Sequence, residues 1–482
     1  MKTLNPFQNW IMPLGIWLGI FVTGSAQSQE TEFKLQIQNQ GPTGIQLEWT
    51  GFAEERVYTA EFRETFSDGE WQPLSPADQW PTSNTSVLDS VPLAQGSSRF
   101  YRVSARVPEP EINRGELISW ELIRDFNSTQ LDFLLSVAGV SQLKAVFDIS
   151  IYKMVYLTVD LMGEETIASG TVAFPTNGGG DLPLVSYQHS VVYRKSDAPS
   201  RFNLTDIETL VGPVFGSSGF FAVSPDYLGL GDSPGFHPFT LAEPTATAVV
   251  DALRAARHLA VEFNVTLNNQ VFLMGYSQGG YSTMAAQRAI EEFHSDEFSL
   301  TATAPMAGPY DLAETMLDVF LSDQNYIFPS ALPYFILAYN EATPFFGDPA
   351  EIFLEPYLTD AISLFDGTHS GAEIDSFLPL IPKEMLREEF LDQIRNNPDH
   401  PFRKAFRENT LLDWVPQTPM RMFHCASDEA MPIENAHKAL ESFKAAGAES
   451  VELIDPASFL GHVDCSLPSV IGALEWFVSL RN

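Results

Sequence analysis

Residues 271–280 read Val-Phe-Leu-Met-Gly-Tyr-Ser-Gln-Gly-Gly, an apolar run that meets a glycine-rich turn directly. The apolar run predicts a buried strand, and the segment that follows, Tyr281 to Ala286, has the composition of a helix. Strand, sharp turn and helix are what a G-x-S-x-G nucleophile elbow requires, with Ser277 at the turn. Glycine is expected two residues either side, because a strained turn brings those positions into close contact with their surroundings. The stretch therefore predicts that Ser277 is a nucleophile.

A serine hydroxyl is a poor nucleophile at neutral pH, so it needs a base, and the base needs an acid that orients it. In α/β-hydrolases these partners follow the serine in the order acid, then histidine. His462 lies in the loop that we expect after the last strand, where the base belongs. Two other histidines are less suitable, because His424 is expected inside a strand and His437 in the middle of a helix. We therefore predict His462 as the base.

The acid should follow the strand that contains His424. Asp428 takes that place, in the segment Ala-Ser-Asp-Glu-Ala-Met-Pro. Glu429 is the runner-up, and Asp464 is a weaker one because it lies too close to the base in sequence. An ordinary helix-capping role is the alternative for Asp428. The predicted triad is Ser277, Asp428 and His462.

The oxyanion hole should use two backbone N–H groups. One belongs to Gln278, and the other to Ser190 or Val191 in the loop after an earlier buried strand. Many α/β-hydrolases have His-Gly in this loop, so Ser190 is a departure, and the sequence leaves open which of the two residues donates. Tyr276 and His189 adjoin the nucleophile and this loop, and are candidate substrate-binding residues. A purely structural role is the alternative for His189.

Length and charge limit the possible functions. The chain has 482 residues, which suits one large domain plus a module, and 44% of them are apolar. Its formal net charge of -35 argues against nucleic acid or an anionic membrane surface as a partner.

The N-terminus has the pattern of a secretory signal peptide: Lys2, an apolar stretch from Trp10 to Val22, and small residues at Gly24 and Ala26. We expect residues 1–26 to be removed. The apolar stretch is short for a membrane span, and no later stretch is long enough. The mature protein should therefore be exported, periplasmic or extracellular, with no membrane span; a retained N-terminal anchor is the alternative.

Residues 31–107 contain short alternating apolar and polar runs, separated by Gly, Pro, Asn and Ser. Such runs predict a small β-sandwich, and Pro108–Glu111 marks a linker after it. The segment loosely resembles fibronectin type III-like modules in the spacing of Trp49, Tyr58, Trp71 and Tyr101. Its expected role is either surface or polymer attachment, or that of a packing or spacer module.

From about Leu117 onward, strands and helices alternate, which predicts a doubly wound, mostly parallel α/β sheet over residues 117–482. We expect strands at 182–187, 219–224, 299–304, 420–424 and 451–454, and helices at 243–259, 434–445 and 468–480.

Between about 308 and 409 the alternation stops, and the chain is rich in Phe and Tyr. An insertion of this length between two sheet strands is typical of a cap over the site. From 289 to 382 there is no Lys or Arg, so an entrance that binds anions is not expected. Phe345 and Phe346 are candidate substrate-binding residues, although most of these aromatic residues should fill the cap's own core.

The chain has two cysteines. Cys425 precedes Asp428 by three residues, and Cys465 follows His462 by three. Because the acid and base loops must converge, the two sulfurs should lie close together, and an exported protein meets an oxidising compartment. We predict a Cys425–Cys465 disulfide; two buried thiols are the alternative.

With these residues in place, the segment from Leu117 to Asn482 resembles the secretory lipase and carboxylesterase group of α/β-hydrolases. Besides the elbow, the resemblance rests on Ala-Ser-Gly-Thr-Val-Ala-Phe-Pro at 168–175, Pro-Asp-Tyr-Leu-Gly-Leu-Gly-Asp-Ser at 225–233, and the segment 414–428. It implies ester hydrolysis through an acyl-serine, and it does not identify the ester.

We therefore expect a secreted serine carboxylester hydrolase that cleaves neutral or apolar esters, either small molecules or polymers, with no cofactor or metal. A serine peptidase of the prolyl-oligopeptidase type is one alternative, but such enzymes usually carry a propeller far larger than the N-terminal module. A non-catalytic adhesion protein on a hydrolase fold is another, and it is disfavoured because no triad member is missing.

Overall fold

The computed structural model describes residues 35–39, 44–49, 57–63, 72–74, 82, 84–90, 99–106, 113–178, 180–204 and 206–482. The predicted signal peptide, the predicted linker Pro108–Glu111 and Trp71 lie outside these residues. The chain divides into two units between Pro110 and Glu111, and each is described by itself.

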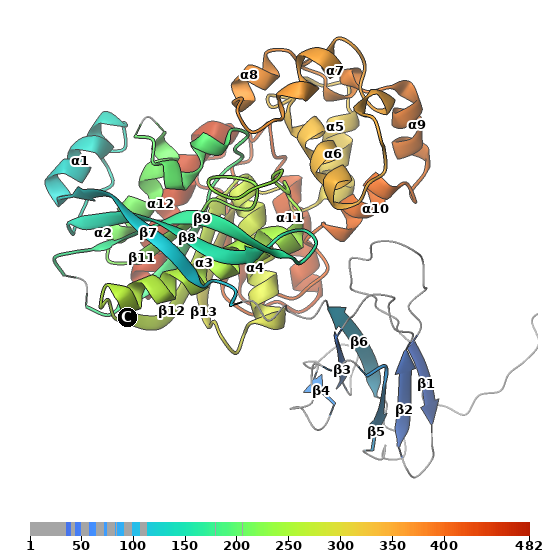
Figure 1. The fold of residues 1–482 in the computed structure, drawn as a ribbon, viewed down its shortest axis with the longest axis horizontal. Helices are drawn as coiled ribbons and strands as arrows, with labels where there is room; N and C mark the ends of the chain where they lie inside the picture. The colour runs from blue at the N-terminus through green and yellow to red at the C-terminus, as the bar shows by residue number, and fades with distance from the viewer. Residues whose placement is uncertain are drawn as a thin grey trace, which may run out of the picture. The chain divides into compact units, whose positions relative to one another are not determined.

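The N-terminal unit contains two small antiparallel sheets of three strands each (Figure 1). One has the order β1-β2-β5 (Leu35–Asn39, Ile45–Trp49, Ser86–Asp89), and the other β4-β3-β6 (Gln72–Pro73, Val57–Arg63, Phe100–Arg106). Ile45, Leu47 and Trp49 alternate with less buried residues, as one face of a strand requires. They share one buried cluster with Tyr58 and Tyr101 of the other sheet. The predicted small all-β unit is thus present, while its likeness to fibronectin type III modules stays a prediction.

The second unit is built on a nine-stranded sheet with the order β15-β14-β13-β12-β10-β11-β9-β8-β7. The strands are β7 (Leu117–Phe126), β8 (Ile149–Val159), β9 (Glu165–Pro175), β10 (Leu182–Gln188), β11 (Phe221–Pro225), β12 (Leu267–Tyr276), β13 (Leu300–Met306), β14 (Met420–Phe423) and β15 (Val451–Ile454). Strands β10 to β15 pair in parallel, whereas β7, β8 and β9 form an antiparallel end that joins β11. Strand β10 is buried along its whole length, as expected for a strand covered on both faces.

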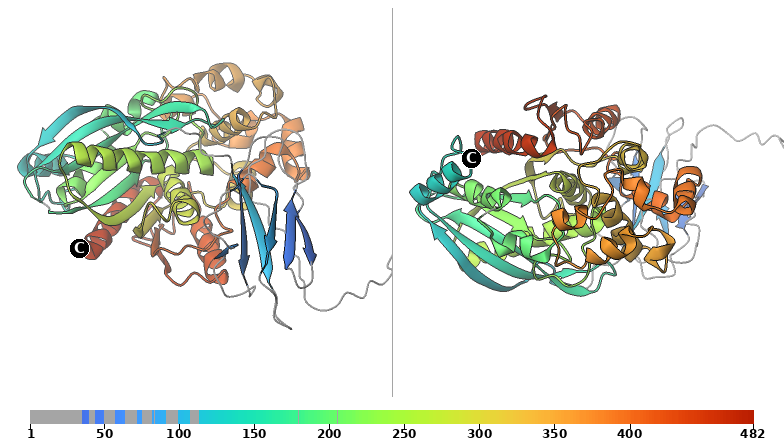
Figure 2. Two further views of the ribbon diagram at one scale, coloured as in Figure 1. Left: turned by 60° about the horizontal axis from the view of Figure 1, so that its bottom comes forward. Right: turned by 90° about the horizontal axis from the view of Figure 1, so that it is seen from above.

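Helices cover both faces of this sheet. They are α1 (Ser128–Val137), α2 (Val211–Ser217), α3 (Ala242–Glu262), α4 (Gln278–Phe293), α11 (Glu434–Ala445) and α12 (His462–Leu480), with 3₁₀ segments η3 (Lys195–Asp197), η4 (Pro199–Arg201) and η5 (Ile207–Leu210). One buried cluster joins the sheet to α1, α2 and α12, and another joins it to α3 and α4. Helices α3 and α12 accordingly lie on opposite faces (Figure 2). The predicted doubly wound, mostly parallel sheet is confirmed.

A helical cap is formed between β13 and β14, at one side of the sheet (Figure 1). It comprises the π-helix η6 (Leu312–Met316), α5 (Leu317–Leu321), α6 (Ala331–Ala342), η7 (Pro349–Glu351), α7 (Tyr357–Asp360), η8 (Ile362–Leu364), α8 (Gly371–Asp375), η9 (Pro382–Met385), α9 (Glu388–Asn396) and α10 (Pro401–Glu408). The Phe406 ring lies 5.2 Å from Phe335 and 5.3 Å from Tyr339, centroid to centroid. Aromatic residues of α6 and α10 therefore build the cap's own core.

Helix α12 begins earlier than expected. The sequence analysis predicts a final helix from about Pro468 to Leu480. In the structure the helix begins at His462 and contains Pro468 in its interior. The carbonyl that Pro468 leaves without a partner is that of Asp464, which is exposed and can bind water. Among the described helices, α12 alone has the length and composition of a membrane span; it packs Ala473 and Phe477 into the core of the sheet.

Candidate active site

Ser277 occupies a strained turn between β12 and α4. Its φ of 59° and ψ of -120° are unusual for a residue with a side chain. Two backbone contacts hold this conformation, because the Ser277 N–H donates to the Met306 carbonyl at 2.9 Å and Gly280 N–H donates to the Ser277 carbonyl at 2.9 Å. The turn therefore has the geometry expected of a nucleophile elbow.

The glycines beside Ser277 are required by close backbone contacts. A Cβ atom on Gly279 would lie 1.9 Å from the carbonyl oxygen of Gln188, and one on Gly275 would lie 2.5 Å from the same oxygen. The end of β10, which leads into the predicted oxyanion loop, thus packs directly against the elbow. The lack of room for a side chain therefore explains the two glycines, in addition to the strained conformation of the turn.

The structure brings Ser277, His462 and Asp428 into one hydrogen-bonded chain. His462 Nε2 lies 2.9 Å from the Ser277 hydroxyl oxygen, and His462 Nδ1 lies 2.7 Å from Asp428 Oδ2. The three residues come from the turn after β12, the loop after β14 and the first turn of α12. All three are nearly closed to solvent, with Ser277 7%, His462 3% and Asp428 7% exposed. A buried chain of this kind can move a proton from the hydroxyl to the imidazole.

The carboxylate of Asp428 is fully hydrogen-bonded. Its Oδ1 accepts from the Ala430 N–H at 3.0 Å and the Met431 N–H at 2.7 Å, while Oδ2 faces His462 and, at 3.4 Å, His424 Nε2. Burial alone would raise the pKa of Asp428, but the two histidines more than offset it and lower that pKa to about 2. Asp428 is therefore ionised over the whole physiological range.

The backbone of His462 is also fixed. The Tyr276 hydroxyl donates to the His462 carbonyl oxygen at 2.5 Å, and the rings of the two residues lie 5.1 Å apart. Glu429 Oε2 accepts the His462 N–H at 3.0 Å, so this runner-up acid caps α12 and does not contact the imidazole nitrogens. Asp464, the other runner-up, is exposed on α12.

The candidate donors of the oxyanion hole differ in whether their backbone N–H groups already have a hydrogen-bond partner. Gln278 is the first residue of α4, so its N–H has no partner within the helix. The Ser190 N–H donates to Glu208 Oε2 at 3.1 Å, and the Ser190 hydroxyl also bonds to Glu208. No described residue accepts a hydrogen bond from the Val191 N–H. Of the two candidates in this loop, Val191 thus has its N–H available.

The side chain of Gln278 points toward His237. Its amide donates to His237 Nε2 at 2.6 Å, and His237 Nδ1–H donates to the Leu228 carbonyl at 2.8 Å. Burial lowers the pKa of His237 to about 3, so this ring is neutral and can accept. The network fixes the Gln278 side chain and does not occupy the Gln278 backbone N–H.

The remaining predicted contacts lie elsewhere. His189 is buried, with Nδ1 2.6 Å from the Ser190 carbonyl and Nε2 3.3 Å from the Asp226 carbonyl, so its ring is engaged with backbone. Phe345 contacts the rings of Phe346, Phe390, His400 and Phe402, all within the cap. The cap ring that lies against the triad is Phe328, 5.9 Å from the His462 ring.

The predicted disulfide between Cys425 and Cys465 is present. It joins the residue after His424 to the first turn of α12, and so connects the loop of Asp428 to the helix of His462.

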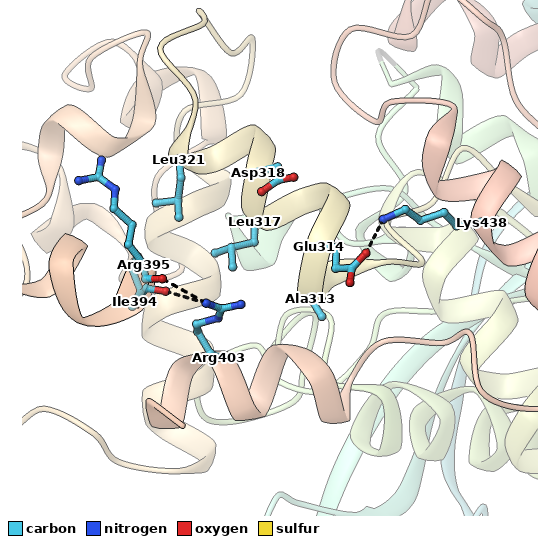
Figure 3. A pocket seen from close by; sticks show the side chains of 9 residues that line it. All are labelled: Ala313, Glu314, Leu317, Asp318, Leu321, Ile394, Arg395, Arg403 and Lys438. Atoms are coloured by element: carbon cyan, nitrogen blue, oxygen red, sulfur yellow. Dashed lines mark hydrogen bonds and ion pairs between the residues drawn. The ribbon is translucent and has the colours of Figure 1, made fainter. Parts of the chain in front are cut away.

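A pocket of about 420 Å³ lies apart from these residues, beside α5 and α11 (Figure 3). It is lined by Ala313, Glu314, Leu317, Asp318, Leu321, Ile394, Arg395, Arg403 and Lys438, and no triad residue is among them. Lys438 is paired with Asp311 at 2.7 Å and Glu314 at 2.8 Å. We do not assign the reaction to this pocket.

Three residues at the site are absent from the set predicted from the sequence. They are His424 beside Asp428, Glu208 beside Ser190, and Phe328 beside His462. For His424, the four-residue spacing to Asp428 is a signal that the sequence does contain. Glu208 and Phe328 carry no comparable signal, because chain folding alone brings them to the site.

Comparisons with known proteins identify the family and the fold. The model of the secretory lipase family matches residues 198–480. Lipase 4 of Candida albicans is 24% identical over 350 residues, which cover 69% of this chain and 72% of the relative. The rice cell wall degrading esterase LipA from Xanthomonas oryzae is 30% identical, with a TM-score of 0.67 over 76% of this chain and 96% of that chain. A putative hydrolase from Legionella pneumophila is 28% identical, with a TM-score of 0.71 over 76% and 98%.

Proposed function

Because this chain belongs to the secretory lipase family and is a carboxylic ester hydrolase, we propose that it acts outside the cytoplasm through an acyl-serine on Ser277. The observation that carries this proposal is the buried hydrogen-bonded chain from Ser277 through His462 to Asp428. The signal-peptide pattern of residues 1–26 and the disulfide support export to an oxidising compartment.

The first half of the reaction forms the acyl-enzyme. Ser277 Oγ attacks the ester carbonyl carbon while His462 Nε2 takes the hydroxyl proton. Asp428 holds the Nδ1–H of His462 and stabilises the imidazolium that results. The negative charge on the carbonyl oxygen is stabilised by the N–H groups of Gln278 and Val191. When the C–O bond breaks, His462 returns the proton to the leaving alkoxide and the alcohol departs.

The second half consumes water. His462 takes a proton from a water molecule, whose oxygen attacks the acyl carbon, and a second tetrahedral oxyanion forms in the same place. Collapse of this intermediate releases the carboxylic acid and returns the proton to Ser277 Oγ. The chemistry needs no group beyond these side chains and the backbone N–H donors.

The favoured substrate is a neutral or apolar ester. The segment 289–382, which includes Phe328, has no Lys or Arg but many Asp and Glu, so this part of the cap offers no cation to an anionic substrate. The ring of Phe328 against His462 offers an apolar contact close to the reacting atoms. For the N-terminal unit we propose a fibronectin type III-like module that acts as a spacer or attaches the enzyme to a surface or polymer.

A panel of substrates tests the proposal. We expect hydrolysis of p-nitrophenyl esters of graded chain length, no hydrolysis of aminoacyl-p-nitroanilides, and covalent labelling by a phosphonate inhibitor. Ser277→Ala should abolish labelling and lower kcat by a factor on the order of 10⁶. Preferential cleavage of the anilides would favour the peptidase alternative, and inactivity of the folded wild type on every substrate would favour the non-catalytic one.

A further inference from the structure

Two histidines converge on the acid Asp428. His462 approaches Oδ2 from α12 with its Nδ1 at 2.7 Å, and His424 approaches the same oxygen from the end of β14 with its Nε2 at 3.4 Å. Only His462 also reaches Ser277, so the proposed mechanism leaves His424 without a role. The acid of the triad thus has a second imidazole beside it that the steps described above do not use.

The surroundings of His424 identify which of its nitrogens carries the proton. Nε2 lies 2.6 Å from the Met431 carbonyl oxygen as well as near Asp428, and both of these atoms are acceptors. Nδ1 is buried and has no hydrogen-bond partner among the described residues. A proton on Nδ1 would therefore be buried without an acceptor, which is costly. The geometry therefore favours a proton on Nε2, which faces the carbonyl and the carboxylate.

His424 and Asp428 thus both bind the main chain of Met431, one at its carbonyl oxygen and the other at its N–H. The Met431 N–H donates to Asp428 Oδ1 at 2.7 Å, while the Met431 carbonyl accepts from His424. His424 itself is fixed, because its N–H donates to the Ile454 carbonyl of β15 at 2.9 Å and its neighbour Cys425 is disulfide-bonded to α12. The orientation of the acid is thereby tied to the sheet.

We propose that His424 is a positioning residue for the ester hydrolysis described above: its Nε2–H fixes the Asp428 carboxylate and leaves Oδ2 aimed at His462. The inference rests on the proposed function only for its kinetic consequences. The contact between His424 and Asp428 can be tested on its own.

The other titratable groups around Asp428 do not take over this role. Tyr276 on β12 and Tyr326 in the cap both act on Asp428 electrostatically, and burial raises the pKa of each hydroxyl, so both stay neutral. Glu429 is exposed and bonds to the His462 N–H. His424 is thus, besides His462, the imidazole that lies against the acid among the described residues.

Removal of the Nε2–H should change the pH dependence of the reaction. Without it, the negative charge of the carboxylate stabilises a proton on His462 more strongly. His462 then stays protonated, and cannot act as the base, up to a higher pH. The acid limb of kcat/KM should therefore move upward. A purely structural loss would lower activity and melting temperature at every pH and leave the limb in place.

Three substitutions separate these outcomes. In His424→Gln the amide nitrogen can occupy the place of Nε2, so kcat for p-nitrophenyl acetate should stay within about threefold of wild type, because the hydrogen bond to the charged acid is kept. His424→Asn buries a similar amide that is too short to reach, and His424→Phe keeps ring volume without a donor. Both should lower kcat by roughly 10–100-fold at an unchanged KM and shift the acid limb upward.

Nuclear magnetic resonance gives a readout that does not need activity. In the wild type, the His424 ring should carry its proton on Nε2 and none on Nδ1, and the pKa of Asp428 should rise in His424→Asn and His424→Phe but not in His424→Gln. An Asp428 pKa that is the same in all four proteins would overturn the inference, whatever the kinetics. Loss of ester hydrolysis in Ser277→Ala, or its absence in the wild type, bears on the proposed function alone.

Discussion

The hydroxyl of Tyr276 donates a hydrogen bond to the carbonyl oxygen of His462 at 2.5 Å, and the two rings lie 5.1 Å apart. The residue that precedes the nucleophile therefore holds the first turn of the helix that carries the base. The sequence analysis predicts Tyr276 as a substrate contact. Since Tyr276 is 2% exposed, its contact with His462 describes its position better.

Tyr276→Phe should lower kcat by roughly three- to tenfold on a short ester, because one neutral hydrogen bond is worth about 1 kcal/mol and the base loses an anchor. KM should change little, since the ring remains. Tyr281→Phe is a matched control, because the Tyr281 hydroxyl donates to the Asn409 carbonyl at 2.7 Å, away from the triad. Equal losses of kcat in both variants, measured beside their melting temperatures, would contradict a specific effect on His462.

Asp428→Asn should lower kcat by a factor on the order of 10⁴, because an amide cannot stabilise the imidazolium and favours the wrong tautomer of His462. Glu429→Gln should cost little, since the amide oxygen can still accept the His462 N–H. Steady-state kinetics at a fixed pH compares the two. If Glu429→Gln were the more damaging change, the acid role would pass to Glu429.

Replacing both cysteines by serine should destabilise the enzyme by roughly 3–4 kcal/mol on the chain-entropy estimate, because the disulfide closes a loop of 40 residues. On heating, activity should be lost before the secondary structure unfolds, as followed by far-ultraviolet circular dichroism, since the bond joins the acid loop to the base helix. Thiol titration of the denatured, unreduced secreted protein should find no free thiol. Two thiols per chain would show that the bond does not form in the protein as made.

Phe328→Ala should change the preference for acyl chain length more than the turnover of the shortest ester, because a buried chain loses apolar contact worth about 25 cal/mol per Å². Phe345→Ala is the comparison, since that ring packs on Phe390 and Phe402 within the cap. It should lower the melting temperature and reduce turnover of all esters alike. A chain-length profile that changes only in Phe345→Ala would restore Phe345 as the substrate contact.

A chain that begins at Glu111, the first residue of the second unit, should keep its kcat and KM for soluble esters. The reason is that the triad and the cap belong entirely to that unit. Binding to polymeric ester, measured by pull-down, should fall if the N-terminal unit attaches the enzyme to its substrate. Loss of soluble-ester turnover in a folded truncation would show that the module contributes to the site.

Local sequence patterns predicted the elements around the site well. The helix over 434–445 and the strand over 451–454 have the expected bounds, because clear apolar periodicity and punctuation mark them. The predicted start of α12 is wrong because Pro468 is tolerated inside the helix, where Asp464, whose carbonyl it leaves without a helical partner, is an exposed residue. Local rules favour proline at a helix start and cannot weigh this compensation.

The site residues, too, could be predicted only where a local sequence pattern marks them. The glycines at 275 and 279 report a strained turn in the sequence itself, so Ser277 could be identified locally. The choice of Phe345 rested on composition, which cannot tell the core of the cap from its inner surface. The Ser190 N–H donates a hydrogen bond to Glu208, and no local sequence pattern predicts that pairing.

The 1.9 Å approach between a Cβ on Gly279 and the Gln188 carbonyl oxygen also matters to anyone who wishes to redesign the enzyme. The turn around the nucleophile lies against main-chain atoms at the ends of β10 and β13, so a side chain at Gly275 or Gly279 would clash with the backbone. The cap, an insertion between β13 and β14 that shares one buried cluster with α4 and α11, meets the triad through a side chain, the ring of Phe328. Laboratory evolution toward new esters should therefore find its productive changes in the inner surface of the cap and leave the turn around Ser277 untouched.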